Sequence, residues 1–312
     1  EITTRLVGSE MCIRDRIVGT SEGALGTCCD FQRMITEKGN ASGSAFKFPN
    51  TVYNAAGGYL SICSGIKGYN VTVTNGAQSG LASMAYAMSV LRSGQENAML
   101  ATGSDENSDI MTELFGKLGV TSESVVTPFA GNDGFVLSDG SASVLIEDEK
   151  AARERGARIY CHAAGYGMAH SNVKFGTLTG SEAGLTNAVN NALADAGMTI
   201  DDIDAVFGFA NGMKAVDDVE IKGLTAVFGD KLAEKPVVEL KEVLGESRAA
   251  AATTAAAHAA LMFAGKIPSQ EAYSIAADGS VSKTNVEASK LNNVLVAAYG
   301  AGGSYTAIVL SK

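Results

Sequence analysis

Short apolar runs alternate along this chain with longer segments in which apolar positions recur every three or four residues. The pattern predicts strands at residues 71–74, 97–102 and 205–210, and helices at residues 80–91, 181–196, 217–228 and 248–265. Ser181 and Gly197 are typical of the start and the end of the helix between them. Strands that alternate with helices in this way predict a layered α/β fold.

Two further segments, residues 133–147 and 293–310, share the pattern of a strand, a glycine-rich turn and a second strand. A hairpin that recurs once in each part of the chain favours a duplicated fold, in which each half closes with such a hairpin. Chance similarity between two glycine-rich hairpins is the alternative.

Composition narrows the class of protein. The 312 residues are 46% apolar and 19% charged, with a net charge of −10. These values are typical of soluble globular proteins, and acidity without basic runs argues against nucleic-acid binding. The most apolar stretch, residues 248–265, is rich in alanine and threonine and contains His258. It therefore predicts a close-packed buried helix rather than a membrane span.

The cysteines predict neither a metal site nor a disulfide framework. Cys28, Cys29, Cys63 and Cys161 fit no metal-ligand spacing, and two adjacent cysteines are poorly placed for disulfide bonds. We therefore expect reduced thiols in the core, which indicate a cytoplasmic protein. We expect no metal and no cofactor.

The first residues do not fit the rest of the chain. Residues 6–16, LVGSEMCIRDR, correspond to what one reading frame of a common sequencing adapter encodes. We therefore interpret residues 1–16 as foreign to the native protein and exclude them from the fold prediction. A genuine N-terminal arm is the alternative.

Residues 71–82, VTVTNGAQSGLA, have the form of a nucleophile elbow, in which a strand turns sharply into a helix that begins near Ser79. Backbone N–H groups and the dipole at a helix N-terminus stabilise a thiolate or an oxyanion. The nucleophile position carries Ala77, between Gly76 and Gln78. Because a methyl group cannot attack a thioester, we expect no covalent acyl transfer at this position.

Three blocks of sequence carry a family resemblance. Residues 48–109 contain the elbow, residues 127–168 contain TPFAGNDGFVLSDGSASVLIE, and residues 296–310 read VAAYGAGGSYTAIVL. In this order the blocks resemble those of β-ketoacyl-acyl-carrier-protein synthases.

The resemblance implies a thiolase-like, duplicated α-β-α-β-α layered fold. Residues 17–150 would form its N-terminal half and residues 151–312 its C-terminal half. The fold would be N-terminally truncated, because the opening strands of the family would precede Ile17.

The same resemblance places the family's catalytic positions on residues that lack the catalytic groups. Its cysteine falls on Ala77, although a shift of one residue in the elbow would select Gln78. Its two histidines fall on Asn211, in FANGMKAVDD, and on Glu246, in KEVLGE. Lys241 matches the family's lysine. We therefore expect no intact Cys-His-His triad for a decarboxylating Claisen condensation.

These substitutions differ in their chemical consequences. Asn211 can still donate a hydrogen bond through its amide. An ionised Glu246 would repel the malonyl carboxylate and the enolate, and only a protonated Glu246 could donate to them. We favour an ion pair of Glu246 with Lys241 or Arg248.

The last matched block contains the loop Tyr299, Gly300, Ala301, Gly302 and Gly303. Ala301 replaces the gating phenylalanine of the family, and the paired glycines preserve a tight turn. A bulky gate is dispensable in a subunit that never carries an acyl chain. The remaining histidines, His162, His170 and His258, are expected to lie away from the site, and Ser79 has no base placed to activate it.

The leading hypothesis is a non-condensing ketosynthase homologue in fatty-acid or polyketide biosynthesis, similar to the chain-length-factor subunits of type II polyketide or polyene systems. Residues 69–74 would pair with the equivalent strand of an active ketosynthase across the dimer axis. Tyr53, Asn54 and Met84 would shape the far end of the partner's acyl tunnel. An acyl-carrier protein would dock through the partner, because carriers are acidic and dock on basic surfaces whereas this chain has a net charge of −10, although a local basic patch at residues 153–158 is compatible with that total.

Two alternatives stay open. One is an active 3-oxoacyl-acyl-carrier-protein synthase or acyltransferase with a rearranged site, which acyl loading dependent on Gln78 or Ser79 would support. The other is a homodimeric acyl-binding or scaffold protein without a catalytic partner, which a retained ligand would support.

Overall fold

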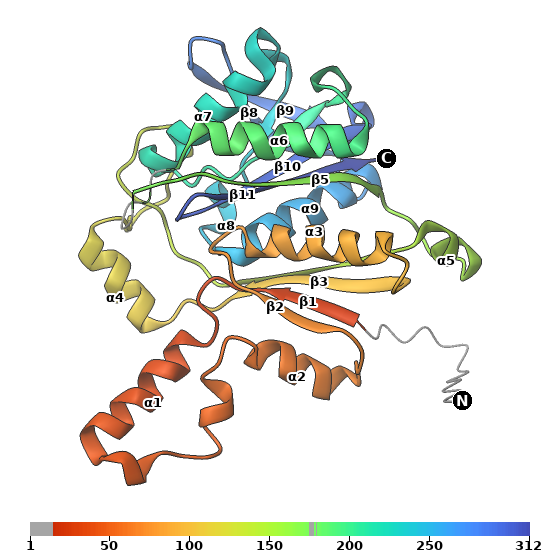
Figure 1. Cartoon of the computed structure of the whole chain (residues 1–312). Helices are drawn as coiled ribbons and strands as arrows, with labels where there is room; N and C mark the ends of the chain where they lie inside the picture. The colour runs from red at the N-terminus through yellow and green to blue at the C-terminus, as the bar shows by residue number, and fades with distance from the viewer. Residues whose placement is uncertain (1–14, 175–177, 179) are drawn as a thin grey trace.

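The computed structural model describes residues 15–174, 178 and 180–312. Helices and two sheets alternate in layers (Figure 1). The helices are α1 (Leu25–Lys38), α2 (Ala55–Ser64), α3 (Ser79–Arg92), α4 (Asp109–Leu118), α5 (Glu149–Glu154), α6 (Glu182–Ala196), α7 (Lys214–Phe228), α8 (Lys241–Leu244) and α9 (Ala249–Phe263). Helices α3 and α9 lie between the sheets, α2 covers the outer face of the first sheet, and α6 and α7 cover the second. This order confirms the expected α-β-α-β-α layers.

The first sheet has the strand order β2-β1-β3-β4. Its strands are β1 (Asp15–Gly19), β2 (Asn70–Val73), β3 (Ala98–Asp105) and β4 (Gly140–Glu147). Strand β1 runs parallel to both neighbours, with Ile17 opposite Val71 and Ala101, whereas β4 runs antiparallel to β3. Strand β2 therefore lies at one edge of the sheet.

The second sheet has the strand order β5-β11-β10-β6-β7-β8-β9. Its strands are β5 (His162–His170), β6 (Ala205–Phe207), β7 (Val237–Val238), β8 (Ser269–Ile275), β9 (Val281–Glu287), β10 (Asn293–Gly300) and β11 (Ser304–Ser311). The run β7-β6-β10-β11 repeats the order and the directions of β2-β1-β3-β4. The expected duplication is therefore confirmed.

Small residues allow the two central helices to approach the sheets and each other closely. A Cβ at Gly80 would lie 2.0 Å from the Ala249 carbonyl oxygen, and a Cβ at Gly103 would lie 2.3 Å from it. The alanine-rich α9 is largely buried, as expected from its composition. Met84 packs into this core with 3% of its surface exposed. The expectation that Met84 faces a partner's tunnel is therefore wrong.

One of the two predicted hairpins, the one within residues 133–147, does not form. The prediction of a strand in the first part of residues 133–147 is wrong. Phe135 forms an isolated bridge with Thr121, Leu137 forms one with Glu246, and β4 pairs with β3. The backbone there bonds to the other half of the molecule instead, as in the Ser138 N–H donating to the Glu246 carbonyl at 3.2 Å. The hairpin of β10 and β11 forms as predicted.

Strand β1 begins at Asp15, two residues before the expected start of the native part. Asp15 accepts a hydrogen bond from the Tyr69 N–H, and the buried Arg16 donates to the carbonyls of Gly57 and Ile66 at 3.1 and 3.2 Å. Residues 1–14 of the segment interpreted as foreign lie outside the described residues. Its foreign origin stays a prediction.

The helix at Glu182–Ala196 ends as predicted, with Gly197 in the left-handed conformation at φ 65°. Ser181 precedes the helix, but its side chain makes no capping hydrogen bond, and its N–H donates to the Tyr305 hydroxyl. Across the described part of the chain, every helix is too short or too polar to cross a membrane.

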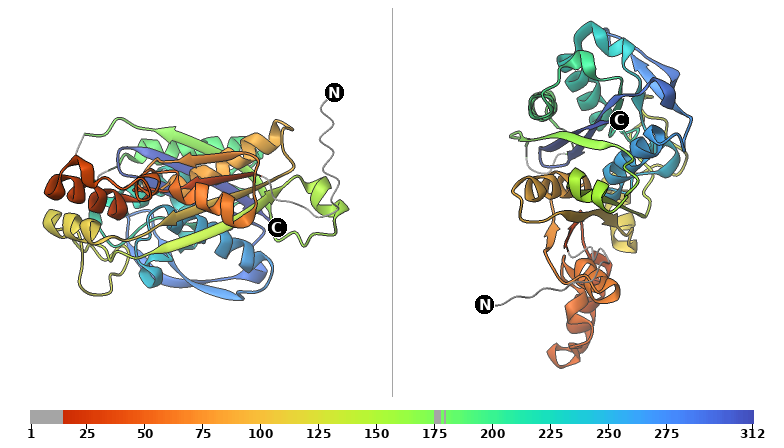
Figure 2. Two further views of the ribbon diagram at one scale, coloured as in Figure 1. Left: turned by 90° about the horizontal axis from the view of Figure 1, so that it is seen from below. Right: turned by 90° about the vertical axis from the view of Figure 1, so that its right-hand side faces the viewer.

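Residues 25–64 form an arm that projects from the layered body (Figure 2). Every residue of α1 keeps part of its surface exposed, and in α2 the buried residue is Gly57. Large apolar side chains are exposed along this arm at Phe46, Phe48, Val52, Tyr53, Tyr59 and Ile62. The arm packs too loosely for its apolar side chains to stabilise the core, so this exposed apolar surface has a role other than core packing.

Candidate active site

The elbow between β2 and α3 has no free nucleophile among the residues described at the turn. Gly76 takes a left-handed conformation, at φ 68°, and Ala77 follows it. The Ser79 hydroxyl donates to the Gly76 carbonyl at 2.6 Å and accepts from the Asn75 N–H at 2.7 Å. Ser79 is fully buried. Its hydroxyl therefore closes the turn, and the exposed part of the elbow presents a methyl group.

Gln78 points into the protein rather than out of the elbow. It is fully buried at the N-cap of α3, and its Oε1 accepts a hydrogen bond from the Thr306 hydroxyl on β11. This contact fastens the start of α3 to the second sheet. Gln78 Nε2 is buried and has no hydrogen-bond partner among the described residues, so the assignment of Gln78 that a one-residue shift in the elbow would give stays a prediction.

The loop from Tyr299 to Gly303 lies against the elbow. A Cβ at Gly300 would lie 2.7 Å from the Asn75 carbonyl oxygen and 3.2 Å from Gln78 Cγ, so this close approach requires glycine. Gly302 and Gly303 have φ values of 109° and 91°, which side chains strongly disfavour. Ala301 is exposed at the tip. The tip of the loop therefore stands beside the elbow without a bulky side chain, and its role as a gate stays a prediction.

Asn211, Lys241 and Glu246 form one hydrogen-bonded cluster. Glu246 Oε2 accepts from Asn211 Nδ2 at 2.9 Å and from Lys241 Nζ at 2.7 Å, and its Oε1 accepts from the Arg248 N–H at 2.9 Å. Lys241 Nζ also donates to the Phe209 carbonyl at 3.1 Å. The expected ion pair of Glu246 with Lys241 is therefore confirmed.

The cluster keeps Glu246 ionised. Burial alone would raise the pKa of Glu246, but Lys241, the Asn211 amide and the Arg248 N–H together hold it below its ordinary value. The amide of Asn211 is held at both ends, since its Oδ1 accepts from the Met213 N–H at 3.1 Å while one N–H of Nδ2 donates to Glu246. The positions that correspond to two hydrogen-bond-donating histidines thus hold an anion and an amide bonded to that anion.

The sequence also allowed an ion pair between Glu246 and Arg248. In the structure the Arg248 guanidinium pairs with Glu22 instead. Arg248 Nε lies 2.7 Å from Glu22 Oε2, and Nη2 donates to the Glu106 carbonyl at 2.7 Å. Arg248 is buried and has a positive φ of 52°, which costs a non-glycine residue roughly 1–3 kcal/mol. Sequence reasoning missed Glu22, because it lies far from Arg248 along the chain and in no recognised motif.

His170 lies closer to the elbow than expected. Its Nδ1 is 3.3 Å from the Ser304 hydroxyl, which donates to Asn75 Oδ1 at 2.9 Å. The expectation that His170 lies away from the site is therefore wrong, because β5 and β11 pair and bring it next to the loop. The other histidines agree with expectation: His162 is 3.8 Å from Glu149, and burial lowers the pKa of His258 on α9.

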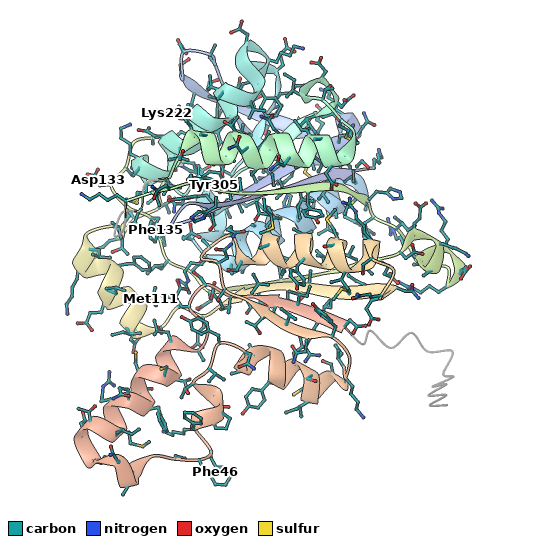
Figure 3. The ribbon with its side chains drawn as sticks, in the orientation of Figure 1. Phe46, Met111, Asp133, Phe135, Lys222 and Tyr305 are labelled. Atoms are coloured by element: carbon teal, nitrogen blue, oxygen red, sulfur yellow. The ribbon has the colours of Figure 1, made fainter. Side chains whose placement is uncertain are left out.

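A cavity of about 710 Å³ opens beside the loop that carries Asn211. Its lining includes Met213, Asp133 and Lys222, the last two labelled in Figure 3. Lys214, also on the wall, bonds to both carboxylate oxygens of Asp218 at 2.8 Å. Charged and apolar side chains alternate on its wall, so the cavity by itself does not select a class of ligand.

Metal and thiol chemistry find little support in the described residues. They contain no group of three or more histidine, cysteine and acidic side chains that could hold a metal ion. Cys28 and Cys63 are exposed free thiols, so the expectation that the thiols lie in the core is wrong for these two, whereas burial raises the pKa of Cys161 to about 11. A thiol with so high a pKa is unreactive at neutral pH.

Comparison with solved structures supports the fold. The ishigamide ketosynthase/chain length factor matches with a TM-score of 0.83 at 22% identity, over 96% of this chain and 75% of that chain. A type II polyketide synthase acyl-carrier protein in complex with its ketosynthase bound to the hexaketide matches with a TM-score of 0.85 at 19% identity, over 97% and 79%. Identities this low show the fold alone, which is the thiolase-like fold that the sequence predicts.

Curated relatives are similar at the sequence level. The 3-oxoacyl-[acyl-carrier-protein] synthase 2 of Vibrio cholerae is 28% identical over 68% of this chain and 53% of its own length. Nodulation protein E of Rhizobium leguminosarum is 29% identical over 68% and 53%. The chain therefore spans about half the length of the curated relatives it matches.

Family models cover most of the chain. The model of the β-ketoacyl synthase N-terminal domain matches residues 13–152, and that of the β-ketoacyl synthase C-terminal domain matches residues 160–273. The two matches follow one another in the order of the two halves of the fold. The chain belongs to the β-ketoacyl synthase family.

Proposed function

We propose that this protein is a non-condensing ketosynthase homologue, similar to a chain-length factor, which pairs with an active ketosynthase and shapes its acyl tunnel. The observation that carries the proposal is the buried Glu246, ion-paired with Lys241 and bonded to Asn211, in a chain whose elbow presents Ala77. Such a site cannot hold an acyl chain as a thioester, and it places a carboxylate where the family has a hydrogen-bond donor to the enolate.

The charge of Glu246 is a stronger obstacle than the loss of a donor. Two like charges about 4 Å apart repel by about 4 kcal/mol at an effective dielectric constant of 20. A penalty of this size corresponds to roughly a thousandfold slower reaction through an enolate next to Glu246. Lys241 offsets part of this repulsion but is already bonded to Glu246 and to the Phe209 carbonyl.

Two features of the structure favour a ketosynthase-like partner. Strand β2 is an edge strand whose outer backbone groups are open to pairing, as expected for residues 69–74. The arm that carries Phe46, Tyr59 and Ile62 is joined directly to β2 through α2, and its exposed apolar side chains need cover. A homologous subunit that presents the same edge and arm would cover both at once.

Co-expression with an intact ketosynthase encoded beside this protein tests the pairing. We expect a heterodimer that Ile62→Asp weakens by at least tenfold in Kd, because a charge would enter the apolar contact. Val243→Asp on α8 is the matched control, since Val243 is as exposed as Ile62, at 81% against 77%, but lies outside the arm. Separate homodimers of the two proteins would contradict the proposal and favour a scaffold protein without a catalytic partner.

A second candidate is an active synthase with a rearranged site, and His170 is the observation that favours it. A serine hydroxyl beside a histidine can act as a nucleophile, and Ser304 lies next to the elbow. Against this, Ser304 donates its proton to Asn75 rather than to His170. Acyl transfer from a labelled carrier thioester that is lost in both Ser304→Ala and His170→Ala would establish this candidate.

A further inference from the structure

Two buried glutamates meet behind the loop that carries Asn211. Glu220 lies on α7 and is fully buried, and Glu239 follows β7 with 4% of its surface exposed. A Cβ at Gly208 would lie 1.8 Å from Glu220 Oε1 and 2.0 Å from Glu239 Oε1. The two carboxyl oxygens are therefore less than about 4 Å apart, and they occupy the space that a side chain at position 208 would need.

The pair has too few hydrogen-bond donors for two negative charges. Glu220 Oε2 accepts from the Phe209 N–H at 2.8 Å. The other oxygen of Glu220 and both oxygens of Glu239 have no hydrogen-bond partner within the described parts of the chain. Two ionised carboxylates in this arrangement would each lack the compensation that a buried charge requires.

The charged and titratable groups around the pair do not supply that compensation. Asp217, on α7, adds a third negative charge, although three backbone N–H groups bond to it. Lys241 is the nearest cation, but it donates to Glu246 and to the Phe209 carbonyl. On β8, Tyr273 faces Glu239 and donates its hydroxyl proton to Glu242.

We propose that Glu220 and Glu239 share one proton, which Glu239 carries and donates to Glu220 Oε1. Through this shared proton, the pair positions the loop that carries Asn211 in a pH-dependent way. Glu220 holds the loop through the Phe209 N–H, and the shared proton removes the repulsion that would push the two glutamates apart. The inference does not depend on whether the protein condenses acyl groups.

The titration behaviour of the two groups agrees with this arrangement. Burial raises the pKa of Glu220 to about 7 and raises the pKa of Glu239 well above its ordinary value. A glutamate in the unfolded chain has a pKa of about 4.3. The stability that the shared proton contributes is therefore present in full below about pH 4.3 and is lost as the pH rises through the folded pKa values.

Chemical unfolding of the full chain at pH values from about 5 to 8 tests the proposal, with Glu239→Gln as the variant. The equilibrium constant for unfolding should rise with pH, and per pH unit the rise should be about tenfold larger in the wild type than in Glu239→Gln. The variant has one fewer proton to release on unfolding. Glu113→Gln, at an exposed ion pair on α4, is the matched control and should keep the slope of the wild type.

Infrared spectroscopy of the wild type gives a second measurement that does not rely on a variant that folds. We expect the carbonyl stretch of a buried protonated carboxylic acid at neutral pH, and we expect it to vanish as the pH rises. Equal slopes in the wild type and in Glu239→Gln, or no such band, would overturn the proposal. A slope that depends on potassium at constant ionic strength would also overturn it, because the pair would then hold a cation instead of a proton.

Discussion

The buried ion pair of Lys241 and Glu246 should dominate the stability of the site. The change Lys241→Met keeps most of the volume of the side chain and removes its charge. Lys241 and Glu246 expose 11% and 7% of their side chains, so that Glu246 would be left buried without its main counter-charge. Removal of one partner from a buried ion pair typically costs 3–5 kcal/mol of unfolding free energy.

An exposed pair on the same half of the fold provides the control. Lys214 and Asp218 expose 62% and 38% of their side chains. Because water screens such a pair, Lys214→Met should cost about 0–1 kcal/mol. The double variant Lys241→Met/Glu246→Gln should regain more than half of the loss, since a neutral amide can still accept from Asn211 without a buried charge.

Equilibrium unfolding in urea, followed by circular dichroism, measures all three variants. The pH dependence adds an independent readout. In Lys241→Met, burial prevails and the pKa of Glu246 should rise above its ordinary value, so that the variant's deficit shrinks as the pH falls towards about 4. Equal losses in Lys241→Met and Lys214→Met, or a deficit that does not change with pH, would refute the reasoning.

Two further predictions concern the elbow and the glutamate pair. Ala77→Cys should leave decarboxylative condensation of malonyl thioester at the background rate, because Glu246 stays ionised. Release of labelled carbon dioxide measures this rate. Activity restored by the cysteine alone would contradict the prediction. Gly208→Ala should lower the unfolding free energy by about 1–3 kcal/mol, because its Cβ would collide with Glu220 and Glu239. Gly58→Ala, with open space around its Cβ, should not be destabilising, and thermal unfolding of both variants makes the comparison.

Periodicity and turn chemistry predict the elements of this fold well, because they depend on residues close together in the sequence. The strand and helix around the elbow form at Asn70–Val73 and Ser79–Arg92, close to the predicted ranges. The hairpin expected within residues 133–147 failed for the opposite reason. Its apolar residues and glycines suit a strand, but its backbone bonds to Glu246 and to residues 120–121, which lie outside any local window.

In the candidate site too, features that depend on local motifs were predictable, and contacts between distant segments were not. Motif positions selected Ala77, Asn211 and Glu246 as candidates, and charge chemistry predicted the bond between Glu246 and Lys241 that the structure contains. The contact of His170 with Ser304 depends on which strands are neighbours in the sheet, so a single sequence does not reveal it. The same is true of Glu239, which meets Glu220 only because α7 and the segment after β7 converge at Gly208.

Intact-protein mass spectrometry of the full-length protein, mixed with acyl and malonyl thioesters of the acyl-carrier protein, tests the central claim most directly. The account predicts an unmodified protein mass and no β-ketoacyl product until an intact ketosynthase is added. A stoichiometric acyl adduct on this protein, or product formed in the absence of the partner, would contradict it.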